Sequence, residues 1–396
     1  MFINDKTAIV GIGSTPYYKR GMSLPQTKIE LACKAILAAC EDAGLSVRDV
    51  DGFAYYSGGF DSALIAQTLG IPEIKFTATL TGGGGGAAGS IGLAAAGIVS
   101  GHAEVVVSLM TLQQPPTARF GAAFATKGTG GYTRPTEPET DFVAPSGLFA
   151  PGQMFAMLAT RHMHLYGTRR EAFGEIAIST RDNAVRRPTA RFRDPITMED
   201  YLSARMISDP LCLFDYTQEN DGAVAVITTS IERARDLRQR PVQLVASAHG
   251  ANGRWGQAIT WMGMPDEYFA SSGHRPVAKA VYERAGVTPQ DIDVALLYDH
   301  FTPMVLMQLE DYGFCPVGEG GPFVEAGNIR WKTGTIPVNT HGGNLSEAYI
   351  IGMTHVKEAV EQLRGQAVNQ VENAELALVT GGPAPMPTSA IILRRS

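Results

Sequence analysis

Two segments of this sequence repeat one pattern, and this repeat limits the fold more than any other feature. Residues 43–56 read Ala-Gly-Leu-Ser-Val-Arg-Asp-Val-Asp-Gly-Phe-Ala-Tyr-Tyr, and residues 285–298 read Ala-Gly-Val-Thr-Pro-Gln-Asp-Ile-Asp-Val-Ala-Leu-Leu-Tyr. Each copy starts with an Ala-Gly pair that ends a helical pattern, passes through a short acidic turn and enters an apolar strand pattern. The chain is therefore predicted to contain two copies of one β/α half.

A second pair of segments supports the same division. Five consecutive glycines at 82–86 precede a small-residue helix at 87–100 and a buried strand at 104–110. Gly342 and Gly343 likewise precede a helical pattern and the apolar strand at 374–379. Related halves usually pack about a pseudo-twofold axis, so the two glycine-rich helix starts should lie beside one another. A flexible linker would not separate a buried strand from a buried helix, so the glycine run is expected to let a ligand or a second strand come close.

The length and the local composition predict how the chain is divided. At 396 residues the chain is too long for one ordinary core, so two or three sub-domains are expected. Proline, threonine and glycine are dense from 113 to 152, and arginine-rich helical patterns follow at 154–166 and 170–185. We predict an α/β fold with an N-terminal half at 1–112 and 222–240, an inserted loop domain at 113–221 and a C-terminal half at 241–396. The insertion is expected to cover the site.

The first half opens with a β–α–β pattern. An apolar strand at 7–12 is followed by an amphipathic helix, whose apolar positions run from 29 to 40, and by a strand at 50–56. The two strands should be parallel. Gly11-Ile12-Gly13 begins a dinucleotide fingerprint, but Pro16 stands where the third glycine should be and no helix opens at once, so nucleotide binding there is disfavoured.

Charge and composition argue against several classes of function. The net charge is -6 and no basic run is present, so a nucleic-acid partner is not expected. The four cysteines (Cys33, Cys40, Cys212 and Cys315) form no C-x-x-C motif, so we expect buried apolar side chains and neither a metal site nor a redox motif. The N-terminus runs straight into a strand pattern, and no stretch of 18 apolar residues is present. A cytoplasmic protein without a membrane partner is predicted.

Two polar stretches carry the candidate functional side chains. Residues 297–303 (Leu-Tyr-Asp-His-Phe-Thr-Pro) and 337–349 (Pro-Val-Asn-Thr-His-Gly-Gly-Asn-Leu-Ser-Glu-Ala-Tyr) each follow an apolar strand pattern and lead into a helical one. The N–H groups of the helix that starts at Gly342-Gly343 should face an oxygen that carries negative charge. The candidate catalytic residues are Tyr298, His300, His341 and Tyr349, and the candidate substrate- or oxyanion-binding residues are Gly84, Gly342, Gly343 and Asn344.

Over essentially its whole length the sequence resembles the thiolase fold, and within it the lipid-transfer-protein (sterol-carrier-protein) type thiolases. The resemblance implies layers in the order α-β-α-β-α. The nucleophilic cysteine of thiolases falls at about Gly84, and their Asn-Glu-Ala-Phe or His-Asp-Ala-Phe element falls on residues 298–301. Their catalytic histidine falls on Tyr349 and their second cysteine near Thr380. Without a thiolate at these positions, an acyl-enzyme and Claisen condensation or thiolytic cleavage are disfavoured.

The residues at these positions resemble the thiolase-fold retro-aldolases of bacterial steroid degradation. This resemblance implies that the two tyrosines form the catalytic pair. It implies a β-hydroxyacyl-CoA substrate with its hydroxyl on a steroid ring, and a ring ketone and propionyl-CoA as products. Coenzyme A would be part of the substrate, and no cofactor would be bound by this chain. A second protein with an OB fold and a zinc ribbon is implied as a partner, together with a homodimer in which the strand at 104–110 pairs across the twofold axis.

A retro-aldol step needs a base for the β-hydroxyl, a stabilised enolate and an acid for the new carbanion. A phenol with a pKa near ~10 is a poor base unless a cation or a helix N-terminus lowers its pKa. His300 beside Tyr298, and a helix at Gly342-Gly343 that carries Tyr349, are expected to supply these neighbours. Gly84 is expected to leave space for a tertiary alcohol. Which tyrosine is the base stays open.

Two alternatives compete with this interpretation. Each tyrosine could be a half-buried aromatic residue that only covers the end of its strand or helix. The whole chain could be a non-catalytic thiolase-fold subunit that binds acyl-CoA or lipid within a hetero-oligomer. The pair of phenols favours the enzyme, because a subunit that had lost its chemistry should carry arbitrary residues at both positions.

Overall fold

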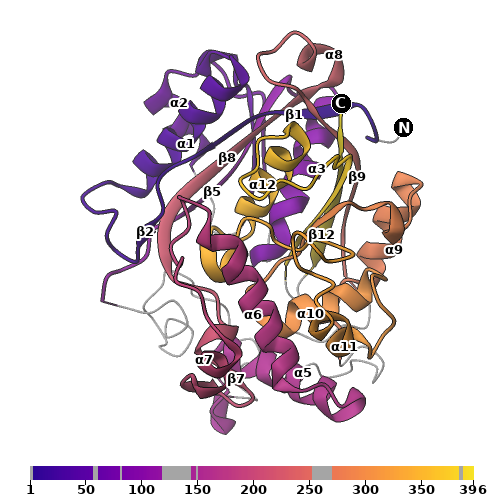
Figure 1. The fold of residues 1–396 in the computed structure, drawn as a ribbon. Coiled ribbons are helices and arrows are strands. Elements are labelled where there is room, and N and C mark those ends of the chain that lie inside the picture. The colour runs from indigo at the N-terminus through magenta and orange to yellow at the C-terminus, as the bar shows by residue number, and fades with distance from the viewer. Residues whose placement is uncertain are drawn as a thin grey trace.

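The computed structural model describes residues 3–56, 61–80, 83–117, 144–148, 150–251, 270–382 and 387–396. One mixed sheet runs through both halves in the strand order β10-β11-β12-β9-β1-β8-β5-β3-β4 (Figure 1). Its strands are β1 (Thr7–Ser14), β3 (Gly52–Tyr56), β4 (Phe76–Leu80), β5 (Val105–Leu112), β8 (Asn220–Ser230), β9 (Val242–Gly250), β10 (Val294–Leu296), β11 (Leu376–Gly381) and β12 (Thr388–Arg395), and the short β2 (Tyr18–Lys19) pairs with β8.

The strand pairing repeats between the halves. In the first half β1 and β8 are antiparallel, β8 and β5 are antiparallel, and β5 and β3 are parallel. The second half repeats this order: β9 and β12 are antiparallel, β12 and β11 are antiparallel, and β11 and β10 are parallel. The halves join where Ala8 and Ile9 of β1 pair with Gln243 and Val242 of β9. The predicted pair of echoing β/α halves is confirmed.

The helices form layers around this sheet. Helix α1 (Lys28–Ala43) packs on β1 and β8, and α9 (Arg275–Ala285) packs on β9 and β12. Helices α3 (Gly86–Val99) and α12 (Met353–Arg364) contact strands of both halves and lie at the centre of the molecule (Figure 1). A Cβ added at Gly89 would lie 2.9 Å from Leu80, so the small residues of α3 let the layers approach closely. The expected α/β architecture is confirmed, with one continuous sheet joining the two halves.

The repeated sequence segments form the same local structure in both halves. Helices α1 and α9 end at glycines in the left-handed conformation, Gly44 with φ 72° and Gly286 with φ 66°. In each half a 3₁₀ turn follows, Val47–Asp49 and Pro289–Asp291, and an aspartate at its end accepts a hydrogen bond from the backbone N–H before the turn. Each turn then leads into the strand whose last residues approach the site, β3 or β10.

The predicted insertion contributes a separate group of helices below the sheet in Figure 1. Helices α5 (Pro151–Tyr166) and α6 (Arg170–Val185) pack against α10 (Thr302–Asp311) and α11 (Gly320–Glu325) of the C-terminal half. The buried His162 joins them, because its Nε2 lies 3.1 Å from Glu310 and its Nδ1 lies 2.8 Å from Thr168. The remaining elements are α2 (Ser62–Leu69), α7 (Met198–Ser203), β6 (Met206–Ser208), β7 (Leu211–Cys212) and α8 (Ile231–Ala234).

One expectation about the strands of the first half is confirmed and one needs correction. Strands β1 and β3 are parallel, as predicted, and β8 and β5 lie between them in the sheet. Strand β5 has β3 on one side and β8 on the other, so its backbone groups are already used and it cannot pair across a dimer axis. The strand at the edge of this half is β4, whose partner in the sheet is β3.

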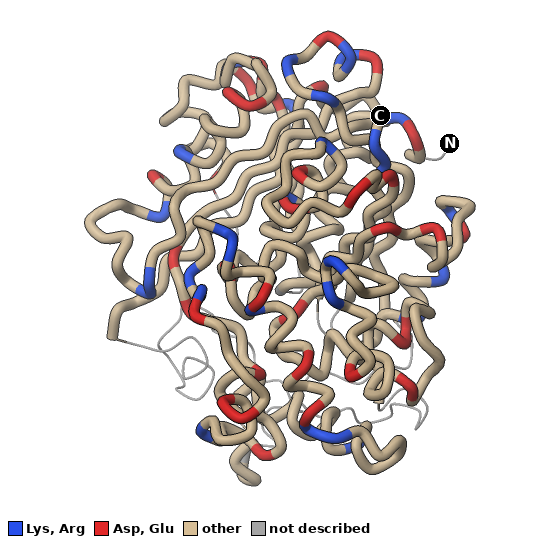
Figure 2. Tube along the Cα trace, viewed as in Figure 1, with Lys and Arg blue, Asp and Glu red and all other residues tan. Residues whose placement is uncertain are grey.

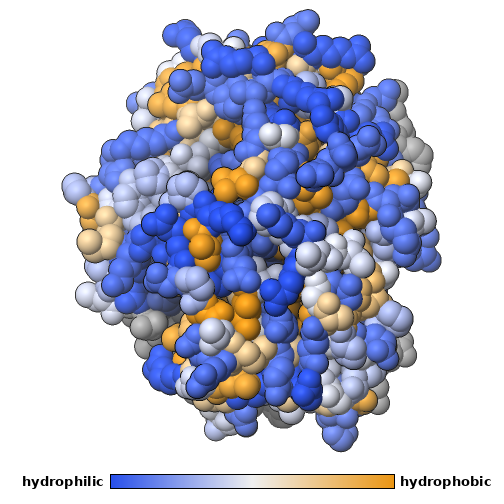
Figure 3. All heavy atoms as spheres, in the orientation of Figure 1, coloured by the Kyte–Doolittle hydropathy of each residue, from blue (hydrophilic) through white to orange (hydrophobic). Residues whose placement is uncertain are grey.

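Charged residues of both signs are spread along the trace of the described residues (Figure 2). The face of the molecule in Figure 3 is mainly hydrophilic, with apolar residues in small groups. Within the described ranges, no helix is long and apolar enough to cross a membrane.

Candidate functional site

The hydroxyls of Tyr298 and Tyr349 lie 3.1 Å apart, within hydrogen-bonding distance. Tyr298 follows the end of β10, and Tyr349 lies in the segment that leads into α12. Both side chains are buried, with 1% and 9% of their residue surface exposed. The structure therefore brings together the two tyrosines that lie 51 positions apart in the sequence.

Hydrogen bonds from β11 and α10 hold the backbone of Tyr298. Its N–H donates to Thr380 Oγ1 at 2.8 Å, and its carbonyl accepts from Gln308 Nε2 at 2.8 Å. Thr380 and Gln308 are themselves joined by a hydrogen bond of 2.6 Å. Asn339 exchanges two hydrogen bonds of 2.8 Å with the backbone of Leu297, which ties the two polar stretches together.

The glycine at position 84 gives room to the Tyr298 phenol. A Cβ added at Gly84 would lie 2.2 Å from the Tyr298 hydroxyl, and a Cβ added at Gly352 would lie 2.9 Å from the ring. The expectation that Gly84 leaves space for a tertiary alcohol is therefore wrong, since the Tyr298 side chain fills that space. The phenol hydroxyl lies where a side chain at the thiolase nucleophile position would begin.

Tyr349 is not part of a helix, which corrects a second expectation. The glycine pair opens a five-residue π turn, Gly343–Glu347, and α12 begins only at Met353. Between them the backbone is irregular, and Ile351 has a φ of 45°, a strained value for a β-branched residue. Asn220 Oδ1 accepts the Tyr349 N–H at 2.7 Å, and the Tyr56 hydroxyl donates to the Ile351 carbonyl at 3.0 Å.

The N–H groups at the π turn face a carboxylate of the protein itself. The backbone N–H of Asn344 donates to Asp299 Oδ1 at 2.8 Å, and His355 Nε2 lies 3.0 Å from the same oxygen. A Cβ added at Gly343 would lie 1.9 Å from Asp299 Oδ2, so glycine is required there. The predicted negatively charged oxygen is present, but it belongs to Asp299, and this turn is not open to a substrate oxyanion.

The electrostatic environment keeps the phenols protonated. Burial raises the pKa of Tyr298 well above its usual value, and the nearby Tyr349 hydroxyl adds to the shift. Burial also raises the pKa of Tyr349. Burial lowers the pKa of His300 to about 3, so this imidazole is neutral at physiological pH and supplies no cation. The expectation that a neighbouring cation lowers the pKa of either phenol is therefore wrong.

His300 and Asn344 are the candidate hydrogen-bond donors of the site. The His300 ring lies 5.1 Å from the Tyr298 ring and packs edge-on against Phe155 at 4.5 Å. Both nitrogens of His300 and both polar side-chain atoms of Asn344 are buried and have no hydrogen-bond partner among the described residues. Buried polar groups are normally paired, so these four atoms are candidates to bind a substrate.

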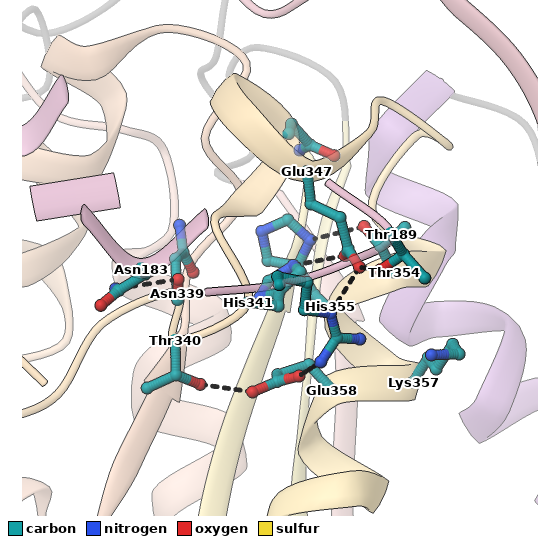
Figure 4. Close-up of polar contacts among 12 residues, drawn as sticks. Asn183, Thr189, Asn339, Thr340, His341, Glu347, Thr354, His355, Lys357 and Glu358 are labelled. Carbon is teal, nitrogen blue, oxygen red and sulfur yellow. Dashed lines mark hydrogen bonds and ion pairs between the residues drawn. The ribbon is translucent and has the colours of Figure 1, made fainter. Parts of the chain in front are cut away.

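His341 lies beside Glu347 and His355, and Gly342 lies beside α6. The Nε2 of His341 is 4.0 Å from Glu347 Oε2, and its ring lies edge-on to His355 at 4.8 Å (Figure 4). Burial lowers the pKa of His341 well below its usual value, so it is neutral. A Cβ added at Gly342 would lie 2.6 Å from the Ala184 side chain, so this glycine lets α6 come close.

The four cysteines contribute no nucleophile to this arrangement. All four are buried with free thiols, and burial raises the pKa of Cys40 and Cys315 to about 12. Within the described part of the chain, no group of three or more His, Cys, Asp and Glu side chains could hold a metal ion.

Sequence reasoning missed several residues that shape the site. Tyr56 stands at the position of the first repeated segment that Tyr298 occupies in the second, so the repeat itself was a signal that Tyr56 ends near the site. Asn220 gave no such signal, because its contact with Tyr349 spans 129 positions of the sequence. Arg187, whose partners include Glu347, was missed for the same reason.

The chain is similar to known proteins over its whole length. Residues 251–395 match the family model described as Thiolase C-terminal domain-like. The chain is 40% identical to the 17-hydroxy-3-oxo-4-pregnene-20-carboxyl-CoA lyase of Mycobacterium tuberculosis, over 99% of this chain and 100% of that protein. It is also 40% identical to the steroid side-chain-cleaving aldolase of Thermomonospora curvata, over 98% of this chain and 97% of that protein.

The solved structures agree with these sequence matches. The structure titled "Ltp2-ChsH2(DUF35) aldolase" matches with a TM-score of 0.91 and 37% identity, over 100% of this chain and 99% of that chain. The human mitochondrial 3-ketoacyl-CoA thiolase matches with a TM-score of 0.68 and 16% identity, over 100% and 99% of the two chains, and so shows the common fold alone.

Proposed function

Because this chain belongs to the thiolase superfamily and is a carbon–carbon lyase within it, we propose that its retro-aldol cleavage acts on a β-hydroxyacyl-CoA and that Tyr298 and Tyr349 move the protons. The substrate is a steroid side-chain CoA thioester with its hydroxyl on a ring carbon. The products are a ring ketone and a short acyl-CoA such as propionyl-CoA. The names of the two relatives support this substrate class, and the contact of 3.1 Å between the two hydroxyls carries the assignment of the proton path.

The two phenols act as one proton-transfer unit. Because burial raises both pKa values, neither phenol starts as a phenolate. One hydroxyl takes the proton of the substrate β-hydroxyl while it passes its own proton to its partner. In the same concerted step the bond between the α- and β-carbons breaks, its electron pair moves into the thioester as enolate charge, and the partner phenol gives its own proton to the α-carbon as it receives the relayed one, so neither phenol ever carries two protons. The proton that leaves the alcohol is thus balanced by the proton that reaches the acyl product.

His300 and Asn344 stabilise the enolate in this proposal. A neutral imidazole carries one N–H donor, and the Asn344 amide carries two. Both side chains are buried and without partners in the described ranges, so they need not break an existing hydrogen bond to serve a thioester oxygen. His341, whose two ring nitrogens are likewise buried without a hydrogen-bond partner in the described ranges, stays a further candidate donor beside Glu347 and His355.

We further propose two protein contacts. The matching structure is titled as an aldolase with a DUF35 protein, and this supports a partner for the present chain with an OB fold and a zinc ribbon. Among the described strands β4 is paired only with β3, and this edge position supports a homodimer, since an edge strand offers its backbone groups to a second chain.

The experiment that tests this function is an incubation of the purified chain with a panel of β-hydroxyacyl-CoAs, with and without the OB-fold and zinc-ribbon protein. We expect a ketone and a shortened acyl-CoA in equal amounts from a steroid thioester, and no acyl group on the protein by mass spectrometry. A thiol-alkylating reagent should leave turnover intact. A covalent acyl-enzyme, or binding of every thioester without cleavage, would contradict the proposal and favour a thiolase route or a binding subunit.

A further inference from the structure

A buried arginine joins the insertion to both sides of the Tyr349 segment. Arg187 follows the end of α6 and has only 4% of its side chain exposed. Its Nε donates to Glu347 at 2.6 Å, its Nη1 to Glu358 at 2.8 Å and its Nη2 to Glu361 at 2.7 Å. Glu347 ends the π turn before Tyr349, and the other two carboxylates belong to α12 after it. We call Arg187 and these three glutamates the Arg187 cluster.

The Tyr349 segment needs such a restraint. It is irregular, and it includes a strained β-branched residue, Ile351 with φ 45°. A backbone in a sparsely populated conformation persists only where its surroundings fix it. At the start of the segment, Glu347 also accepts the Thr189 hydroxyl at 2.7 Å, and its carbonyl accepts the Arg191 N–H at 2.9 Å (Figure 4).

The composition of the cluster also argues for a role beyond stability. Three acidic side chains face Arg187, and Lys357 pairs with Glu361 at 2.5 Å, so the cluster gathers three acidic and two basic side chains. A buried ion-pair cluster is weak as a source of stability, because removing charges from water offsets most of their attraction. Three directional contacts from one planar guanidinium do, however, fix the positions of the elements that they join.

We propose that Arg187 is a positioning residue for the retro-aldol reaction: through Glu347 on one side and α12 on the other, it holds the Tyr349 hydroxyl at the Tyr298 hydroxyl. The inference rests on the proposed function of the tyrosine pair. It also makes the insertion, which supplies Arg187, a structural part of the catalytic site. Arg187 acts through Tyr349 and does not touch the reacting atoms.

The first test compares two substitutions of Glu347. Glu347→Ala frees the start of the Tyr349 segment and leaves Arg187 with two carboxylates, so the chain should still fold. We expect kcat to fall by about 10²-fold with KM within about 3-fold, since small misplacements of a catalytic group have effects of this size. Glu347→Gln keeps an oxygen for Arg187 and Thr189 and should retain kcat within about 3-fold. Equal kcat values for Glu347→Ala and wild type would overturn the proposal.

The second test removes the arginine beside a matched control. Arg364 on α12 is also buried and pairs with Asp42 at 2.7 Å, but it faces α1 and β1 instead of the Tyr349 segment. We expect Arg187→Met to lose kcat by at least about 10-fold and Arg364→Met to keep the kcat of its folded fraction. If Arg187→Met does not fold, the comparison of Glu347→Ala with Glu347→Gln still tests the positioning role. A loss of kcat in Arg364→Met as large as that in Arg187→Met would show a general effect of stability and contradict the proposal.

Hydrogen exchange tests the positioning role of Arg187 independently of the proposed catalytic function of the tyrosine pair. Amide exchange in the peptide 345–352, measured by mass spectrometry without substrate, should speed up in Glu347→Ala and stay near the wild-type rate in Glu347→Gln. If Tyr349→Phe stays active, the proposed function fails while this exchange result still tests the restraint. If Tyr349→Phe is inactive but exchange in Glu347→Ala is unchanged, the positioning role is wrong and the function stands.

Discussion

A Cβ at position 84 would lie 2.2 Å from the Tyr298 hydroxyl, so the residue types at these two positions depend on each other. The same dependence joins Gly343 to Asp299. At the scale of residues, two glycines without side chains leave room for two functional groups of the site: Gly84 for the Tyr298 phenol and Gly343 for the Asp299 carboxylate. A side chain at position 84 and the observed position of the Tyr298 phenol therefore exclude each other.

Gly84→Ala should therefore act on the tyrosine pair. The added methyl group must displace the Tyr298 ring, and we expect a loss of activity of at least about 10-fold together with a loss of about 1–3 kcal/mol in the free energy of unfolding. Gly250→Ala is a matched control, because a Cβ at Gly250 meets nothing within 4 Å. Steady-state kinetics and denaturant unfolding of both variants check this, and full activity in Gly84→Ala would contradict the placement of Tyr298.

At the scale of elements, α12 carries a carboxylate whose ionisation opposes folding. Burial is the main cause that raises the pKa of Glu358 to about 7; the nearby Arg187 opposes this shift, and Glu361 adds to it. Lys357 and Arg187 hold the pKa of Glu361 at about 2, so Glu361 stays ionised at neutral pH. Glu347 also raises the pKa of Glu358, and the Thr340 hydroxyl, which donates to Glu358 at 2.6 Å, lowers it.

This arrangement predicts a pH-dependent stability. Because the folded pKa of Glu358 lies above its unfolded value of about 4.3, its stabilising contribution is complete below the unfolded pKa and is lost as the pH rises through about 7. Glu358→Gln removes this dependence. From about pH 5.5 to about pH 8.5, the free energy of unfolding of the wild type should fall by about 1–2 kcal/mol relative to the variant. Urea unfolding of both proteins across this range checks it, and parallel curves would contradict the shift.

At the scale of the whole molecule, the sequence predicted what depends on local pattern or on repetition. The amphipathic spacing from Ile29 to Cys40 predicted α1, and the repeated Ala-Gly segments predicted helix ends and turns that the structure confirms at Gly44 and Gly286. The two tyrosines were identified through the positions that a fold family reserves for chemistry, and the structure places their hydroxyls together.

Features that depend on distant contacts could not be predicted in this way. Nothing local to Gly342-Gly343 shows that Asp299 fills the π turn, or that Ile351 adopts a positive φ before α12. The pKa of each phenol is raised because residues from several elements bury it. The sequence neighbours, His300 and the glycine pair, predicted a lowered pKa instead. The strand order also depends on distant contacts. It places β5 between β8 and β3, so the prediction that β5 pairs across a dimer axis is wrong.

The exposed edge of β4 predicts a dimer. We expect sedimentation velocity at micromolar concentration to give twice the mass of the chain, with backbone pairing along β4 and not along β5. A monomer at that concentration would contradict the dimer. Slow hydrogen exchange at the amides of β4 in the dimer, compared with a diluted sample, would locate the contact.

The central claim is that two phenols carry the proton transfers, and the kcat of Tyr298→Phe, Tyr349→Phe and the double variant tests it most directly. Each single variant should lose about 10²–10⁴ in rate, while losing one hydroxyl should lower the free energy of unfolding by only about 1 kcal/mol. The double variant should lose far less than the product of the single losses, because the phenols act as a unit. Tyr312→Phe, which removes a buried hydroxyl bonded to His274, is the matched control and should stay active. If Tyr349→Phe cleaves a β-hydroxyacyl-CoA within a few-fold of the wild-type rate, the tyrosine pair is not the catalytic unit.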